Sequence, residues 1–197
     1  TTCMENGSLA ENGTGKFSDF DAKVLKRIKS LGANYIWYTG VIRHATCTDY
    51  SAYHIPRQHP AVVKGKAGSP YAICDYYDVD PDLADDVDRR MEEWESLIAR
   101  SHNAGFKVVI DFVPNHVARQ YRSIAKPAGV QDLGHDDNTH WHFSPQNNFY
   151  YCVNEPFVSP AGQGYMESPA RATGNDAFTA HPSINDWYET VKLNYGI

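Results

Sequence analysis

Two segments of the chain repeat the same order of a helix, a glycine and a short apolar strand. In residues 20–31 apolar side chains recur at helical spacing, and residues 33–41 are rich in β-branched and aromatic residues. Residues 85–104 repeat the helical spacing, and residues 107–113 (KVVIDFV) read as a short buried strand. Two such units in tandem predict parallel strands with helices packed outside them, in a doubly wound sheet or a (β/α) barrel.

The expected helices have recognisable ends. Ser18 and Asp19 can cap the start of the first helix, and acidic residues crowd the start of the second, as the helix dipole favours. Gly32 and Gly105 stand where each helix should stop.

Polar residues come directly after the second expected strand, where an α/β fold usually places its active site. The run HNAGFKVVIDFVPNH, residues 102–116, presents Asp111, Asn115 and His116 there. A carboxylate, an amide and an imidazole can together hydrogen-bond a polyhydroxylated ligand or hold a cation. The same residues are equally typical of an aspartate bonded to nearby backbone and of a core histidine, so both interpretations stay open.

A second candidate is the segment SPYAICDYYDVDP, residues 69–81, in which tyrosines alternate with aspartates. Aromatic rings that take C–H groups and carboxylates that take hydroxyls have the chemistry of a sugar-binding surface. The alternative is a turn-rich loop whose aspartates cap turns and whose tyrosines pack, and the segment taken alone favours that alternative. The residues concerned are Tyr71, Asp75, Tyr76, Tyr77, Asp78 and Asp80.

Residues 134–142, GHDDNTHWH, bring three histidines and two aspartates into one short run. They suggest, as one alternative, a metal enzyme that uses His135, His140 and His142, although such loose spacing is poor evidence for zinc. The four cysteines are far apart and form no CxxC pair, which argues against a zinc ribbon and leaves their pairing open.

The composition is that of an ordinary globular protein, with 42% hydrophobic and 21% charged residues and a formal net charge of −6. No basic run offers a surface for nucleic acid or an anionic membrane, and no apolar run is long enough to span a bilayer. The chain also lacks the G-x-G-x-x-G, Walker and G-x-S-x-G motifs. We therefore expect no nucleic-acid partner, no membrane-spanning segment, and no dinucleotide, NTPase or serine-hydrolase site.

Two irregular stretches interrupt the expected α/β pattern. Residues 42–84 make a connection far longer than an ordinary βα loop, and excursions of that size usually carry function. Residues 117–185 are rich in Pro, Gly, Asn and His and show no good helix, which predicts an irregular lobe inserted after the strand. Two strands cannot close a barrel and would leave apolar faces uncovered, so we expect the chain to be a piece of something larger.

Taken in order, these segments resemble the α-amylase family of glycoside hydrolases, family 13. GFKVVIDFVPNH resembles the first short signature region of that family, and SPYAICDYYDVDP resembles the segment that precedes it. Residues 16–33 resemble the first barrel helix, and residues 31–50 resemble the second barrel strand with its loop. PQNNFYY, TGND and NDWYETVKLNYG look like the irregular lobe that the family inserts after the third strand. The resemblance covers nearly the whole chain.

The resemblance implies an α/β fold that is part of a (β/α)8 TIM barrel, from helix 1 to strand 3, with an irregular lobe inserted after strand 3. Residues 1–116 would form the N-terminal part of the catalytic barrel. Residues 117–197 would form the inserted B-type lobe leading toward strand 4. The remainder of the barrel would be needed for a complete fold.

The resemblance also assigns roles to single residues. Tyr71 would stack on the sugar at the cleavage subsite, His116 would hydrogen-bond the same sugar, and Asp111 would be a structural acid beneath this substrate-binding site. Asn115 matches a position that supplies a side-chain oxygen to calcium in calcium-binding members, and an oxygen-only site suits calcium better than zinc. Two departures are visible: Ala72 stands where many relatives carry Asp or His, and the lobe lacks an obvious full set of acidic calcium ligands.

The family's catalytic carboxylates lie on later barrel strands, after the inserted lobe. A retaining glycosidase needs two carboxyl groups about 5–5.5 Å apart, and the resemblance assigns neither to this chain, so we expect none of its Asp or Glu residues to be catalytic. The parent protein would hydrolyse α-glucosidic bonds in starch or maltooligosaccharides with retention, while this chain alone would be inactive.

Two alternatives remain within the resemblance. One is a transglycosylase of the same family, and the other, of a different class, is a non-catalytic glucan-binding relative. Because polymeric starch lies outside most cells, we expect an extracellular, periplasmic or cell-surface location.

Overall fold

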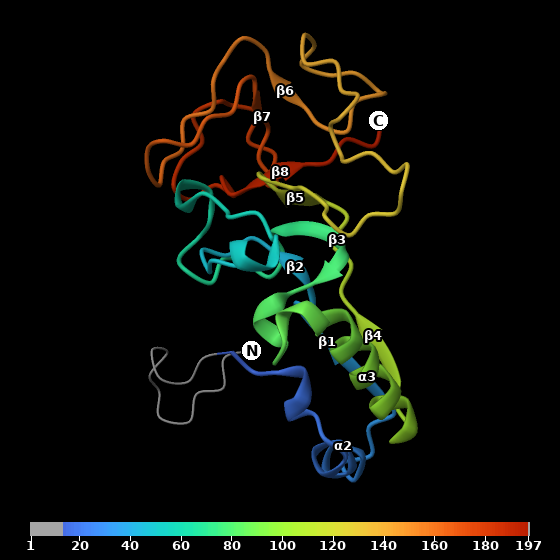
Figure 1. Ribbon diagram of the computed structural model, residues 1–197. Coiled ribbons are helices and arrows are strands. Elements are labelled where there is room, and N and C mark those ends of the chain that lie inside the picture. The colour runs from blue at the N-terminus through green and yellow to red at the C-terminus, as the bar shows by residue number, and fades with distance from the viewer. Residues whose placement is uncertain (1–13, 197) are drawn as a thin grey trace. The chain divides into compact units, whose positions relative to one another are not determined.

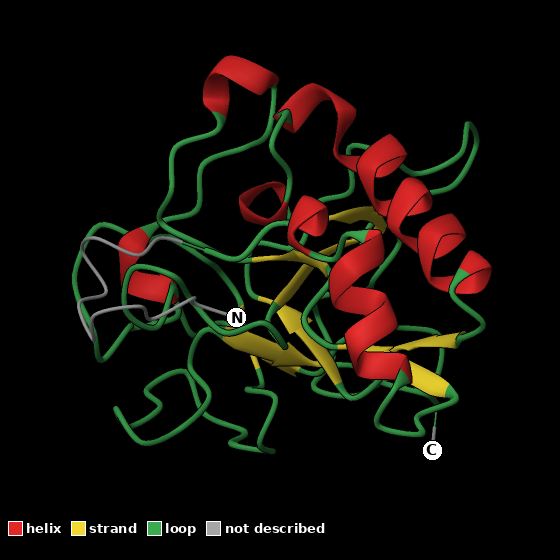
Figure 2. Cartoon of the chain, turned by 90° about the horizontal axis from the view of Figure 1, so that it is seen from below, coloured by secondary structure: helices red, strands yellow, loops and turns green. Residues whose placement is uncertain are grey.

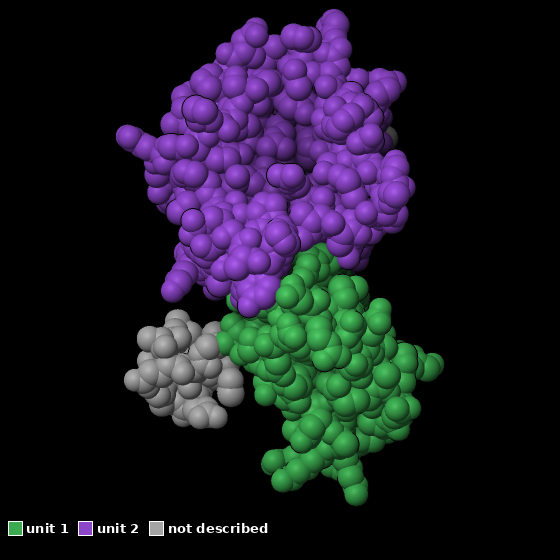
Figure 3. Space-filling view, in the orientation of Figure 1, with its two compact units in different colours: residues 1–43, 78–111 green, residues 44–77, 112–197 purple. Residues whose placement is uncertain are grey.

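The computed structural model describes residues 14–196, so Cys3 lies outside the described part. The chain forms two compact units (Figure 3). Unit 1 consists of the residues up to Arg43 together with Asp78–Asp111, and unit 2 consists of His44–Tyr77 together with the residues from Phe112 onward. This division differs from the predicted boundary after residue 116, because residues 44–77 group with the later lobe. The assignment of residues 1–116 to the barrel and 117–197 to its insertion stays a prediction.

Unit 1 contains both expected helix–strand repeats (Figure 1). Its strands β1 and β4 are parallel, with Ile36 opposite Val108, which confirms the predicted parallel pairing. The elements of unit 1, in chain order, are η1 (Phe17–Asp19), α2 (Ala22–Lys29), β1 (Tyr35–Tyr38), η4 (Pro81–Leu83), η5 (Val87–Arg89), α3 (Arg90–Asn103) and β4 (Lys107–Ile110).

The C-terminal ends of both helices agree with the sequence prediction, and the N-terminal end of the first helix does not. Gly32 and Gly105 follow the two helices with φ of +88° and +81°, a left-handed conformation that glycine adopts without a steric penalty. The predicted N-cap of the first helix was wrong. Asp21 caps α2 by accepting the Val24 N–H at 2.7 Å, because the Asp19 carboxylate is bound to the Lys16 N–H at 2.6 Å.

The core of unit 1 lies between the helices and one side of the short sheet. Leu25 and Leu97 are fully buried there, next to the rings of Trp94 and Phe106. The expected burial of the second strand is not observed, because the sheet has only two strands among the described residues. Its other side leaves Trp37 67% exposed.

Unit 2 is built almost entirely from loops. Loops, coloured green in Figure 2, also make up much of the chain as a whole. Among its described residues no helix longer than a 3-10 turn occurs, which agrees with the irregular lobe expected after residue 116. Strands β5 and β8 pair antiparallel, as do β6 and β7. The elements of unit 2 are η2 (Ser51–Tyr53), η3 (Pro60–Val62), β5 (His116–Ala118), β6 (Tyr151–Cys152), β7 (Ala170–Arg171) and β8 (Thr190–Lys192).

The chain passes from one unit to the other three times: within β2 (Ile42–His44), within β3 (Ile73–Val79), and between Asp111 and Phe112. Strands β2 and β3 pair with each other. Across the described residues, no helix combines the length and the apolar character needed to cross a membrane.

A buried cluster of two arginines and one glutamate holds the loops of unit 2 together. Arg119 donates to Glu167 Oε1 at 2.6 Å and to the carbonyl oxygens of Tyr188 and Thr190 at 2.8 and 3.1 Å. Arg171 donates to the other carboxylate oxygen and to the Arg119 carbonyl, both at 2.7 Å. Burial opposes ionisation of Glu167, but Arg171 and Arg119 outweigh it and hold the pKa of this carboxyl below its usual value.

We expect Glu167→Ala to lower the free energy of unfolding by about 3–5 kcal/mol, because it leaves two guanidinium groups without their buried counter-charge. Urea unfolding of the wild type and the variant measures the change. The exposed Glu155 is the matched control, and its alanine variant should stay within about 0.5 kcal/mol. A loss below about 1 kcal/mol for Glu167→Ala would show that the cluster does not hold the lobe together.

Candidate functional site

A pocket of about 320 Å³ in unit 2 contains both residues predicted to contact a sugar directly. The structure thus brings Tyr71 and His116 together, although they are far apart in the sequence. The volume is at the lower end of the roughly 300–1,000 Å³ of small-ligand sites. The residues that line the pocket are Lys64, Ser69, Tyr71, Val113, His116, Trp187, Glu189 and Thr190.

Two aromatic side chains are exposed at this pocket. Tyr71 is 47% exposed and Trp187 is 43% exposed, so both side chains are accessible to a ligand. The edge of Trp187 meets the His116 ring at a centroid distance of 5.3 Å and an interplanar angle of 61°. An aromatic face beside hydrogen-bonding groups is suited to a sugar ring, which carries C–H groups on its faces and hydroxyls at its edge.

His116 is buried at the start of β5 and is held by its sequence neighbour Asn115. The β5–β8 register sets His116 opposite Lys192, and the Lys192 ammonium donates to Asn115 Oδ1 at 2.6 Å. Because an ammonium only donates, it fixes which end of the Asn115 amide is oxygen. The amide nitrogen then donates to the Gly174 carbonyl at 2.8 Å and to His116 Nδ1 at 2.9 Å. His116 Nδ1 is therefore an acceptor, and the ring proton of the neutral imidazole lies on Nε2.

The same surroundings keep this imidazole neutral. Burial holds the pKa of His116 below its usual value, and the Lys192 charge lowers it further. A hydrogen bond with the Tyr71 backbone acts in the opposite direction without cancelling these effects. A neutral imidazole is a hydrogen-bonding group and adds no positive charge to the pocket.

Gly174 allows this close packing. A Cβ at this position would lie 2.5 Å from Thr190 Oγ1 and 2.9 Å from His116 Cγ, closer than real contacts permit. Glycine is therefore required here for close approach and not for an unusual backbone angle.

The site does not suit calcium. The Asn115 oxygen that would coordinate the ion already accepts a hydrogen bond from the Lys192 ammonium. This ammonium also forms an ion pair with Asp176 at 3.1 Å. Calcium needs six to eight oxygen ligands, and within the described residues no group of three or more His, Cys, Asp or Glu side chains could hold a metal. Calcium binding at Asn115 stays a prediction that these contacts disfavour.

Asp111 belongs to unit 1, apart from the unit that forms the pocket. Its Oδ1 accepts the Trp37 indole N–H at 2.5 Å, while its buried Oδ2 has no hydrogen-bond partner among the described residues. Its assignment as an acid beneath the sugar site stays a prediction.

In the tyrosine–aspartate segment, residues 69–81, one residue faces the pocket and others make contacts that stabilise the fold. Of its residues only Tyr71 lines the pocket. Asp75 is fully buried, and its carboxylate accepts hydrogen bonds from the Ser123 hydroxyl at 2.6 Å and from the Ile124 N–H at 2.8 Å. Asp80 caps a turn by accepting the Asp82 N–H at 2.9 Å. The contacts of Asp75, Asp80 and Tyr76 agree with the alternative of capping aspartates and packing tyrosines. Asp78 has a structural role of another kind, because its carboxylate pairs with Arg90 at 2.7 Å.

The histidine-rich run is held by structural contacts. His135 bonds to the neighbouring Asp136 at the surface, with 2.7 Å between Nδ1 and Oδ1. His142 Nδ1 bonds to the Tyr151 carbonyl at 2.8 Å, and Asp137 accepts from the backbone of Asn148 and Phe149. These contacts give no support to the metal-enzyme alternative, and among the described residues no three His, Cys, Asp or Glu side chains form a group that could hold a metal ion.

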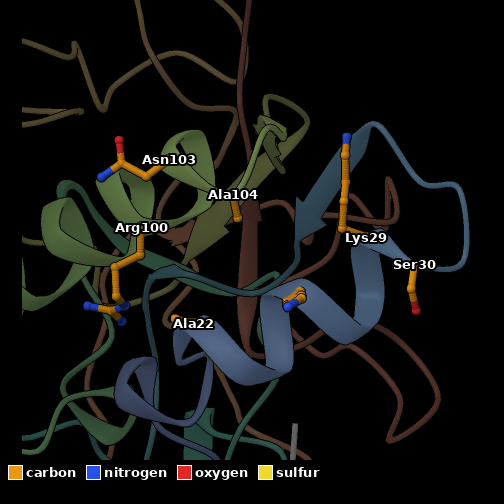
Figure 4. Close-up of a pocket in the computed structure, with 7 residues that line it drawn as sticks. Ala22, Lys29, Ser30, Arg100, Asn103 and Ala104 are labelled. Atoms are coloured by element: carbon orange, nitrogen blue, oxygen red, sulfur yellow. The ribbon is translucent and has the colours of Figure 1, made fainter.

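Two larger hollows contain neither Tyr71 nor His116. One, of about 590 Å³ in unit 1, is lined by residues of α2 and α3 (Figure 4). Its cationic groups serve the fold, since Arg100 donates to the Phe17 carbonyl at 2.8 Å and Lys29 to the Gly105 carbonyl at 2.8 Å. The other, of about 540 Å³ in unit 2, is lined largely by aromatic rings, including that of Tyr121.

Sequence reasoning missed four residues around the pocket. Lys64, Trp187 and Glu189 line it, and Lys192 orients Asn115. The run NDWYETVKLNYG was predicted only to be part of the lobe. No local pattern in it indicates which side chains face a ligand. The one signal was the clustering of Trp, Glu and Lys next to a short β-branched run.

The comparison with known proteins decides the family. The family model described as alpha amylase, catalytic domain, matches residues 11–164. The chain belongs to the α-amylase family. The match covers most of the chain and includes Tyr71, Asp111, Asn115 and His116.

Known relatives of this family member match it over a small part of their own length. Maltase A2 of Drosophila melanogaster is 32% identical over 139 residues, covering 70% of this chain and 21% of the maltase. Amino acid transporter heavy chain SLC3A1 of Homo sapiens is 37% identical over 51 residues, covering 26% of this chain and 7% of that protein. The crystal structure of an alpha-amylase from Lactobacillus plantarum is 28% identical, with a TM-score of 0.41, covering 55% of this chain and 21% of that one.

We expect the pKa of His116, measured by NMR titration of its ring protons, to lie below the ordinary 6.5. Lys192→Met should raise it, because the variant removes a positive charge that disfavours the imidazolium. Lys66→Met, at an exposed lysine of the same unit, should leave it unchanged. A His116 pKa at or above 6.5 in the wild type, or no rise in Lys192→Met, would contradict this account of the imidazole.

Proposed function

We propose that the protein hydrolyses α-glucosidic bonds in starch-like glucans or maltooligosaccharides with retention, and that unit 2 supplies one wall of its sugar site. The observation that carries the proposal is the pocket in which the exposed rings of Tyr71 and Trp187 accompany the buried, neutral His116. Membership of the α-amylase family supports the reaction type. An extracellular, periplasmic or cell-surface location remains an expectation that follows from the substrate.

In this proposal the residues of the chain bind and orient the sugar. Tyr71 stacks on the ring, and the His116 imidazole hydrogen-bonds a hydroxyl of the same sugar. The hydrogen bond from His116 strengthens as the sugar distorts toward the transition state. It therefore lowers the activation free energy of hydrolysis as well as the KM. The nucleophile and the acid/base lie on later barrel strands, and no Asp or Glu of this chain is assigned either role.

We expect His116→Ala in the full-length protein to lower kcat/KM by roughly tenfold to a hundredfold, the range for losing a strong hydrogen bond. Tyr71→Ala should cost about 1 kcal/mol of sugar affinity through lost stacking. Soluble starch, pullulan, maltooligosaccharides and trehalose serve as substrates. His181→Ala and Tyr53→Ala, at exposed positions outside the pocket, are the matched controls. Unchanged hydrolysis in both site variants would show that the sugar does not bind in this pocket.

We further propose that unit 1 is part of a (β/α)8 barrel whose other strands cover the open side of β1 and β4. The support is the exposure of apolar side chains on that side, Trp37 and Val109 among them, which a soluble protein rarely leaves uncovered in a sheet.

This second proposal predicts a difference between the isolated chain and the full-length protein. The isolated chain of residues 1–197 should bind the hydrophobic dye ANS strongly, and the full-length protein should bind it weakly, because added strands would bury the apolar side. Titration with the dye at equal protein concentration measures the difference. Equally weak binding by both proteins would mean that nothing further covers this sheet.

A second candidate function is that of a non-catalytic relative that keeps the sugar pocket without the acids. The match to an amino acid transporter heavy chain favours it. Downstream sequence separates the two. An Arg-x-Asp at the end of a later strand, followed by a Glu and an Asp at strand ends, supports the hydrolase or a transglycosylase, whereas their replacement supports the non-catalytic relative.

A further inference from the structure

The pocket of unit 2 contains an acidic side chain that the proposed sugar contacts leave unused. Glu189 lines the pocket, and its side chain is only 6% exposed. The buried oxygen Oε2 accepts no hydrogen bond from the described residues. A buried carboxylate oxygen without a donor is costly, so a donor brought by a ligand would stabilise it.

Among the residues that the structure describes, the ion-pair partner of this oxygen is Lys64. The Lys64 Nζ lies 3.3 Å from Glu189 Oε2, an ion pair without hydrogen-bond geometry. The ammonium is held at the pocket, since it donates to the Asp186 carbonyl at 3.0 Å and lies 5.3 Å from the centre of the Tyr188 ring. A carboxylate that accepts and an ammonium that donates therefore stand side by side on one wall.

We propose that Glu189 is a sugar-contacting residue of this pocket, and that with Lys64 it makes the pocket select a neutral hydroxylated ring over a sugar phosphate. This inference rests on the proposed function, because it requires that a sugar bind beside Tyr71 and His116. Glu189 accepts a hydrogen bond from a ring hydroxyl, a charge-assisted bond stronger than one between neutral groups. Lys64 pairs with this carboxylate at 3.3 Å and can donate to a second hydroxyl.

Charge accounts for the selectivity. Glu189 and Lys64 cancel, and the other residues that line the pocket carry no charge when His116 is neutral. A phosphate would therefore approach a wall whose single ammonium is already neutralised, next to a carboxylate that repels it. Specificity of this kind depends on the repulsive group as much as on the attractive one.

The test compares the binding of two ligands, glucose and glucose 6-phosphate, to the full-length protein by ligand-observed NMR titration. Glu189→Gln keeps the shape and removes the charge, and we expect it to weaken glucose binding by about tenfold, as for one lost hydrogen bond to a charged group. The same variant leaves Lys64 unneutralised, so the preference for glucose over glucose 6-phosphate should fall. Lys64→Met should shift that preference the opposite way. Glu155→Gln, at an exposed acid outside the pocket, should change neither quantity.

The possible results separate this inference from the proposed function. A thermal shift in either variant without any change in preference would show that the ion pair only stabilises the fold, and would overturn the inference. Tyr71→Ala is measured in parallel. If it weakens glucose binding while Glu189→Gln does not, the inference fails and the sugar site stands. If neither variant affects glucose binding, the pocket is not the sugar site and both fail.

Discussion

The architecture of unit 2 depends on the buried Arg119 side chain. A lobe made of loops cannot satisfy its backbone carbonyls by regular pairing, yet buried polar groups need partners. Arg119 is fully buried and supplies donors to carbonyls of three residues that surround β8 and β7, while Glu167 neutralises it. It follows β5 directly, so the same side chain that satisfies the loops also anchors the strand on which His116 stands.

A second chain of contacts sets the state of the site. The Lys192 ammonium orients the Asn115 amide, and the amide in turn assigns the imidazole proton of His116 to Nε2. A positive charge in this position also does part of what a bound cation would do, because it attracts and orients the amide oxygen. The strand pairing of β5 with β8 is what makes this possible, since its register sets Lys192 opposite His116.

The sequence predicted local features well and distant contacts poorly. Helical spacing followed by glycine located both helix–strand units, because these features depend on residues close in the chain. The parallel pairing of β1 with β4 joins distant residues, and it was predicted from the repeat of the helix–strand order. Family resemblance selected Tyr71 and His116, and the structure places both at one pocket. Glu189, Lys64 and Lys192 were missed because their roles arise from loops that meet only after folding. The prediction that the second strand is buried was wrong, because burial depends on neighbouring strands and not on the strand's own residues.

The pocket is assembled from three stretches of chain that are distant in sequence, around residues 64–71, 113–116 and 187–190. Long segments of chain separate these stretches, and bringing the ends of each segment together costs conformational entropy before any contact compensates for it. Proteins dominated by such distant contacts fold slowly compared with helical ones. The ligand site of this lobe should therefore be among the last parts of the molecule to form, and a newly made chain would acquire its helices well before it could recognise a sugar.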